Sequence, residues 1–199
     1  MLNKSWKIVF VFAVVVFLIS CGAKEEKAKP VEQFAVKLET LPAMTVATLN
    51  RTGPYSEVKQ AMADLMTWLE ANKVTPAGQP FTLYYDSPAD VSPESCSWAV
   101  CVPVPPETKG DEKSGIDITA LGPITVAFTI HTGGLEKISE TYDKLTNWID
   151  EQDLVIAGPA VEFYLSGGEV PSESIKVKAG FVVQPVPDEE GDKEETGGS

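Results

Sequence analysis

Residues 41–53 read LPAMTVATLNRTG and residues 121–133 read LGPITVAFTIHTG, so one pattern recurs after 80 positions. Identical residues continue at this spacing, without a gap, further along the chain: Leu65 and Leu145, Trp68 and Trp148, Ala77 and Ala157, and Tyr84 and Tyr164. Similarity at one fixed spacing indicates that a structural unit is present twice. We therefore expect the body of the protein to consist of two related repeats.

Each copy predicts the same order of elements. The β-branched run TVATL at 45–49 predicts a strand that a glycine turn ends. Apolar residues then recur every three or four positions between Val58 and Leu69, and again between Ile138 and Ile149, which predicts one helix per copy. Two further apolar runs in each copy predict two more strands. We therefore expect an α+β fold in which two pseudo-twofold-related β-α-β-β repeats form one antiparallel sheet, with both helices on one side.

The composition changes at the boundaries of these repeats. A polar segment, 107–117, is the predicted linker between repeat one at 35–106 and repeat two at 118–187. Residues 21–34 are polar and charged, which predicts a flexible tether. Residues 188–199 are acidic and rich in glycine, which predicts a disordered tail.

The first 20 residues are predicted to be a targeting segment. Two lysines precede the apolar run IVFVFAVVVFLIS, which is too short for a comfortable transmembrane helix and is typical of a signal peptide. The junction LISC at 18–21 resembles a bacterial lipobox, whose cysteine is diacylated and becomes the mature N-terminus. We expect residues 1–20 to be a lipoprotein signal peptide and Cys21 to carry the palmitate-type lipid. An uncleaved anchor or an ordinary signal peptide is the alternative.

This interpretation places the body in the bacterial cell envelope, anchored to a membrane and facing the periplasm or the exterior. Gly22 after the cysteine is compatible with sorting to an outer membrane.

The overall composition excludes several classes of function. The 199 residues carry a formal charge of −13, and the sequence has no basic stripe that could bind nucleic acid. The single histidine, His131, is expected to be structural, and Cys96 and Cys101 have no partners at metal-ligand spacing. We expect no metal, no cofactor and no nucleic-acid partner; the sequence does not predict the oligomeric state.

A carboxylate interrupts the apolar strand within GPAVEFYLSGGEVP, residues 158–171. Because side chains alternate along a strand, Val161 and Phe163 share one face, and Glu162 and Tyr164 share the other. The apolar face is expected to pack under the helices. Glu162 and Tyr164, with Thr82 and Tyr84 of the first copy, are then expected to face away from the helices, toward a groove between the repeats.

Three stretches together resemble the GyrI-like domain, also known as the effector-binding domain of AraC-type regulators: LNRTGPYSEVKQAMADLMTWL at 49–69, LYYDSPADVSPESCSWAVCVPV at 83–104 and AGPAVEFYLSGGEVPSESIKVKAGFVVQPV at 157–186. Together with the duplication, the resemblance covers about residues 35–187. The resemblance implies paired β-α-β-β units with a ligand cleft between them. Members bind small, often lipophilic and cationic molecules. Some relatives hydrolyse strained cyclopropanoid electrophiles, and one group binds DNA gyrase.

The resemblance also implies roles for particular residues. Glu162 falls on the acid that characterises the family's cleft. Gly53 and Tyr55 fall on the family's Gly-x-Tyr motif at the start of the first helix, whereas the second copy has Leu135 in place of the tyrosine.

Five residues are the candidate ligand-binding set: Glu162, Tyr164, Tyr55, Tyr84 and Trp98. The alternative for Glu162 is a solvated carboxylate on an open sheet face. The alternative for the aromatic residues is ordinary packing, which is what we expect for Trp68 and Trp148.

Three functions remain open at this point. The first is a membrane-anchored protein that binds a small lipophilic or cationic compound outside the cytoplasm. The second is a hydrolase of small strained electrophiles in which Glu162 is the general acid or base. The third is a protein-interaction module. We expect a binding protein rather than an enzyme.

Overall fold

The computed structural model describes residues 34–166 and 170–187. The predicted signal peptide, the lipid-bearing Cys21, the tether up to residue 33 and the tail at 188–199 lie outside the described residues. None of the helices in the described part of the chain is long and apolar enough to cross a membrane.

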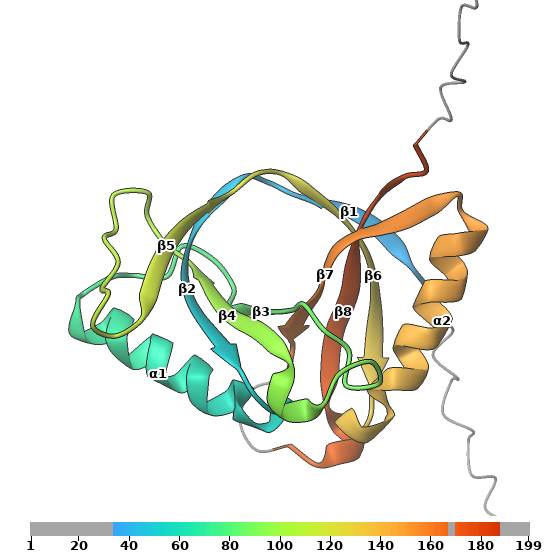
Figure 1. The fold of residues 1–199 in the computed structure, drawn as a ribbon, viewed down its shortest axis with the longest axis horizontal. Coiled ribbons are helices and arrows are strands. Elements are labelled where there is room, and N and C mark those ends of the chain that lie inside the picture. The colour runs from blue at the N-terminus through green and yellow to red at the C-terminus, as the bar shows by residue number, and fades with distance from the viewer. Residues whose placement is uncertain (1–33, 167–169, 188–199) are drawn as a thin grey trace, which may run out of the picture. The chain divides into compact units, whose positions relative to one another are not determined.

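One antiparallel sheet of eight strands forms the centre of the domain, in the order β1-β6-β8-β7-β3-β4-β2-β5 (Figure 1). The strands of the first repeat are β1 (Lys37–Leu41), β2 (Met44–Thr52), β3 (Phe81–Tyr84) and β4 (Ser97–Pro103). Those of the second repeat are β5 (Ile116–Leu121), β6 (Ile124–Thr132), β7 (Leu154–Tyr164) and β8 (Lys176–Pro185). The helices are α1 (Val58–Ala71) and α2 (Ile138–Glu151), each preceded by one 3₁₀ turn.

The spacing of 80 positions holds in the structure as it does in the sequence. The first and last residues of α2 lie 80 positions after those of α1, and the same holds for β6 and β2. The glycine that follows each of these strands has a positive φ, +147° at Gly53 and +127° at Gly133, which favours glycine over residues with a Cβ. The expected α+β fold, with two helices on an antiparallel sheet, is confirmed.

Each repeat contains one strand more than its apolar pattern predicted. The additional strands are β1 and β5, and β5 begins at Ile116, within the segment 107–117 that was expected to be a linker. Both are edge strands whose residues are mostly exposed or half-buried. They lack the continuous apolar run that marks a buried strand, because only one side of each meets the rest of the sheet.

The two repeats exchange their outer strands. β1 of the first repeat pairs with β6 of the second, and β5 of the second pairs with β2 of the first. At the centre of the sheet, β3 and β7 join the repeats directly. The pseudo-twofold relation therefore passes through the β3–β7 pair, where Thr82 lies opposite Glu162.

Both helices lie against the sheet (Figure 1), and each buries an apolar stripe there. In α1, Leu65 and Leu69 are buried with Trp98 and Val100 of β4. In α2, Leu145 and Ile149 are buried with neighbouring residues of β6 and β8. Full burial of each such side chain contributes about 1.5–3 kcal/mol to stability, so this packing holds the helices at fixed positions over the sheet.

The expected assignment of the two faces of β3 and β7 is wrong. Leu83, Val161 and Phe163 do not pack under the helices but form a second core on the other face. The apolar residues that cover this core come from β1, β2, β5 and β6, the strands of the exchanged pairs: Leu41, Met44, Val46, Leu121, Ile124, Val126 and Phe128. Because these strands bury the apolar face, the face with Glu162 and Tyr84 is the one that meets the helices.

Candidate functional site

Glu162 is a buried carboxylate in the middle of the sheet. It lies on the central strand β7, between Thr82 of β3 and Ala179 of β8, and its residue exposure is only 5%. Buried glutamates are uncommon unless they have a partner. The described residues supply no ion pair with lysine or arginine at Glu162.

Three tyrosines surround this carboxylate. The Tyr142 hydroxyl, from α2, donates a hydrogen bond of 2.8 Å to Glu162 Oε1. The hydroxyls of Tyr84 and Tyr164 lie 3.0 Å apart and form a hydrogen bond with each other. Tyr84 and Tyr164 are equivalent residues of the two repeats, so the pseudo-twofold relation brings their hydroxyls together beside the single glutamate.

Tyr55 extends the group on the side of the first repeat. Its ring meets the edge of the Tyr84 ring, with 4.6 Å between the ring centroids. Its hydroxyl donates to the carbonyl oxygen of Asp86. The structure therefore brings Glu162, Tyr84, Tyr164 and Tyr55 together, as the sequence predicted, and adds Tyr142. These five residues are called the Glu162 cluster below.

Trp98 has a different environment. It pairs with Tyr84 across β3 and β4, but the residue is only 1% exposed and belongs to the core under α1. Its Nε1 donates a hydrogen bond of 2.9 Å to the carbonyl oxygen of Gly53. Trp98 is therefore part of the same buried core as Tyr84, and its Nε1 already has a hydrogen-bond partner within the protein.

Burial raises the pKa of the Glu162 carboxyl above its ordinary value. The hydrogen bond from Tyr142 opposes this increase, and Tyr164, Tyr84 and the charge on His131 act in the same direction as Tyr142. Burial also raises the pKa of the Tyr84, Tyr142 and Tyr164 hydroxyls, and the neighbouring carboxylate raises these values further. The tyrosines therefore stay protonated at neutral pH and can donate hydrogen bonds.

The cluster reaches the surface through Tyr164, which is 39% exposed. Tyr55 and Tyr142 are half-buried, whereas Tyr84 and Glu162 lie deeper. Aromatic rings thus lie between the carboxylate and solvent. Such a site can accept an apolar group that carries a positive charge, because the rings and the carboxylate both attract cations.

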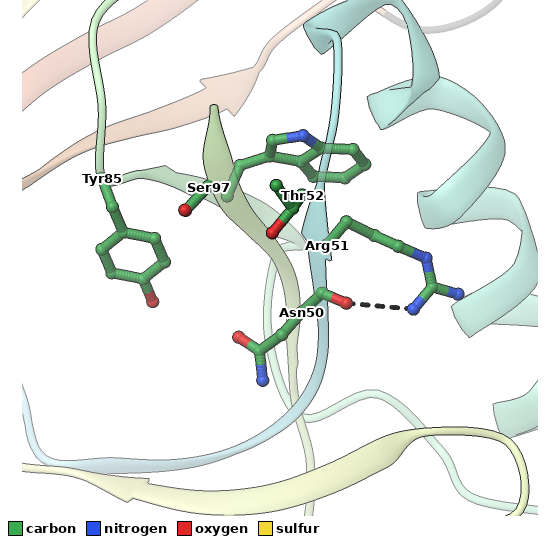
Figure 2. Close-up of a pocket in the computed structure, with 6 residues that line it drawn as sticks. Asn50, Arg51, Thr52, Tyr85 and Ser97 are labelled. Atoms are coloured by element: carbon green, nitrogen blue, oxygen red, sulfur yellow. Dashed lines mark hydrogen bonds between the residues drawn. The ribbon is translucent and has the colours of Figure 1, made fainter. Parts of the chain in front are cut away.

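A separate shallow hollow of about 270 Å³ lies at the end of β2, β3 and β4, and Figure 2 shows residues that line it: Asn50, Arg51, Thr52, Tyr85, Ser97 and Trp98. Ser97 precedes Trp98 on β4, so its side chain points to the other face, and Tyr85 directly follows the end of β3. The Arg51 guanidinium donates a hydrogen bond of 3.0 Å to the carbonyl oxygen of Asn50. None of the residues that line the hollow belongs to the Glu162 cluster.

His131, Cys96 and Cys101 are not members of the Glu162 cluster, although two of them act on it: His131 opposes the increase in the pKa of Glu162, and burial and then Cys96 raise the pKa of Tyr55. His131 is buried, and its ring nitrogens lie 2.8 Å from Thr141 Oγ1 and 3.2 Å from the carbonyl oxygen of Gly134. Cys96 and Cys101 are buried free thiols. No group of three potential metal ligands occurs among residues 34–166 and 170–187.

The sequence reasoning missed Tyr142, which it treated as one member of the apolar stripe of the second helix. Its equivalent in the first repeat is Met62, a purely apolar residue. This difference between the copies could have indicated that the Tyr142 hydroxyl forms a hydrogen bond that the first repeat lacks.

A family model for the GyrI-like small molecule binding domain matches residues 34–183. The match covers most of the chain, and the protein belongs to this family. A comparison with curated proteins finds no match.

Solved structures agree with this fold. The C-terminal domain of EcmrR is 20% identical, with a TM-score of 0.67, and the alignment covers 77% of this chain and 99% of that domain. In the EcmrR–DNA complex, the match is 18% identical with a TM-score of 0.68 and covers 77% of this chain but only 58% of the EcmrR chain. A hydrolase from Listeria innocua is 12% identical with a TM-score of 0.57, over 75% of this chain and 91% of the hydrolase. At these identities the likeness concerns the fold.

Proposed function

We propose that this GyrI-like domain binds a small lipophilic cation, with Glu162 as the counter-charge. The observation that carries the proposal is a buried carboxylate with three tyrosines around it and no lysine or arginine partner among the described residues. A carboxylate in such a place loses much of its hydration without gaining a salt bridge. A bound cation supplies the missing charge and stabilises the ionised form.

The tyrosines contribute in two ways. The Tyr142 hydroxyl holds the carboxylate in place through its hydrogen bond to Oε1. Their rings provide apolar surface and attract positive charge, and one cation–π contact contributes about 0.5–2 kcal/mol depending on how far it is desolvated. The tyrosine rings and the Glu162 carboxylate together suit a cation whose charge is surrounded by apolar groups.

The proposal includes a place in the cell. The lipobox-like sequence at 18–21 supports a lipid on Cys21, which would hold the domain at a membrane outside the cytoplasm. Two or three acyl chains anchor a protein stably, because each buried CH₂ contributes about 0.8 kcal/mol. A domain at the membrane surface would meet lipophilic cations where such compounds concentrate.

Hydrolysis of a small electrophile is the second candidate. It is supported by the buried position of the Glu162 carboxyl, which raises its pKa above the ordinary value as suits a general acid, and by the tyrosine that orients it. A hydrolase from Listeria innocua has a similar fold.

A ligand screen by thermal shift separates the candidates. The full chain would be tested in neutral detergent against lipophilic cations and strained electrophiles, with each stabilising compound analysed by mass spectrometry. A binding protein gains stability by RT ln(1 + [L]/Kd) and leaves the compound intact, whereas an enzyme consumes it. Glu162→Gln should abolish either response, and Glu70→Gln on the exposed side of α1 is the matched control. A response that survives Glu162→Gln would refute the proposed site.

A further inference from the structure

Thr82 is a fully buried threonine, with 0% exposure, whose hydroxyl has no hydrogen-bond partner. Within the part of the chain that the structure describes, its Oγ1 is the only buried side-chain nitrogen or oxygen in this condition. Buried polar groups nearly always have partners, because an unpaired group loses its hydration and gains nothing in return. The exception at Thr82 therefore requires an explanation.

Thr82 lies directly beside the carboxylate of the Glu162 cluster. It is the residue opposite Glu162 in the antiparallel pairing of β3 and β7, and both side chains are on the face that meets the helices. Opposite residues of such a pair have Cβ atoms about 4.5–5.5 Å apart. The two positions are also equivalent in the two repeats, so one repeat contributes a hydroxyl where the other contributes a carboxylate.

Packing alone does not account for the hydroxyl. Val100 is the neighbour of Thr82 on β4, and it is fully buried on the same face. Valine has nearly the shape of threonine and would fill the position of Thr82 without an unpaired polar atom. An unpaired hydroxyl at this buried position therefore lowers stability, which a partner for the hydroxyl would offset.

The chemistry of this partner follows from the groups nearby. Tyr142 already donates to Glu162 Oε1, and the Tyr84 and Tyr164 hydroxyls are bonded to each other. A group that enters between Thr82 and Glu162 would meet a hydroxyl, which can accept as well as donate, and a carboxylate, which only accepts. A positively charged N–H group satisfies both acceptors at once. A quaternary ammonium or phosphonium has no N–H and leaves Thr82 unpaired.

We propose that Thr82 and Glu162 together bind the N–H groups of a protonated amine, so that the domain prefers primary or secondary ammonium compounds over quaternary cations of the same shape. The inference rests on the proposed function and narrows its class of ligand. Glu162 provides the charge, the tyrosine rings contact the apolar part, and Thr82 distinguishes an N–H from an N-methyl group.

The test compares two probes that differ in their N–H groups. The first is 2-naphthylmethylamine, which is protonated at neutral pH, and the second is its N,N,N-trimethyl quaternary derivative. Dissociation constants would be measured by titration calorimetry with the full chain in neutral detergent, with partition of each probe into detergent corrected in a protein-free blank. The variants are Thr82→Val, which keeps the shape, and Thr82→Ser, which keeps the hydroxyl.

Thr82→Val should weaken binding of the amine about 10- to 100-fold, the usual effect of one hydrogen bond to a charged group, and change binding of the quaternary probe less than about 2-fold. Thr82→Ser should retain most of the preference for the amine. Without ligand, Thr82→Val should melt at the same temperature as the wild type or higher, because it removes an unpaired buried hydroxyl.

Equal effects of Thr82→Val on both probes would overturn the inference while leaving the proposed function intact, provided that both probes still require Glu162. A lower melting temperature of unliganded Thr82→Val would also overturn it, because the hydroxyl would then have a partner in the empty protein. If neither probe requires Glu162, the proposed function fails and the inference fails with it.

Discussion

The hydroxyl of Tyr142 on α2 donates a hydrogen bond of 2.8 Å to the carboxylate of Glu162 on β7, which joins a helix of the second repeat to the centre of the sheet. The bond lowers the pKa of a carboxyl that burial otherwise raises. The position of α2 is therefore coupled to the charge state of Glu162.

Tyr142→Phe tests this coupling. The change removes the hydrogen bond but keeps the ring, so the pKa of Glu162 should rise further above its ordinary value. Binding of the quaternary naphthylmethyl probe needs the ionised carboxylate, so the pH of half-maximal affinity should move upward relative to the wild type. Calorimetric titrations between pH 5 and pH 9 measure the shift. An unchanged pH profile would show that the hydroxyl does not hold the carboxylate.

The pH dependence of stability tests the burial of Glu162. Because its folded pKa is raised, its contribution to stability is fully present below the unfolded pKa and is lost as the pH rises through the folded pKa. Glu162→Gln does not ionise, so without ligand it should become progressively more stable than the wild type as the pH rises above about 4.5, the unfolded value. Urea unfolding of both proteins between pH 4 and pH 8 measures the difference. A constant difference across this range would contradict a buried carboxylate without a lysine or arginine partner.

Trp98→Phe separates packing from ligand contact. The indole is fully buried under α1 and bonds the carbonyl oxygen of Gly53, so the smaller ring leaves a void and an unpaired carbonyl. The free energy of unfolding should fall by about 1–3 kcal/mol, while ligand affinity at a temperature where the variant is folded should change less than about 3-fold. Trp148→Phe, at a half-buried position on α2, is a milder control. Lost affinity with unchanged stability would place Trp98 in the binding site.

Cys21→Ser tests the proposed lipid anchor. Serine cannot receive the thioether-linked diacylglycerol, so a protein that fractionates with membranes should lose this attachment or remain as an unprocessed precursor. Membrane fractionation with mass spectrometry of the N-terminal peptide measures both outcomes. Cys101→Ser, at a buried thiol within the sheet, is the control that should leave lipidation unchanged. An unmodified Cys21 in membrane-bound wild-type protein would contradict the anchor.

The sequence predicted the repeats and both helices because their signals are strong. The spacing of 80 positions and the apolar stripes that contain Leu65 and Leu145 can be read directly from the chain. The edge strands β1 and β5 could not be predicted in the same way, because their residues are mostly exposed and carry no clear apolar pattern.

The sequence also grouped Glu162 with Tyr84 and Tyr164 correctly, since alternation along a strand fixes which residues share a face. It could not decide which face meets the helices. That choice depends on the exchange of β1 and β5 between the repeats, which covers Val161 and Phe163, and such long-range pairing leaves no local trace. Tyr142 was missed for the same reason, because its role depends on the face over which α2 lies.

The most direct test of the central claim is the affinity of the wild-type chain and of Glu162→Gln for the quaternary naphthylmethyl probe, measured by titration calorimetry at pH 8. The account predicts binding by the wild type and a loss of at least about 10-fold in Glu162→Gln, because the neutral amide removes the counter-charge while keeping nearly the same shape. Equal affinities of the two proteins would contradict the claim that Glu162 is the centre of a cation site.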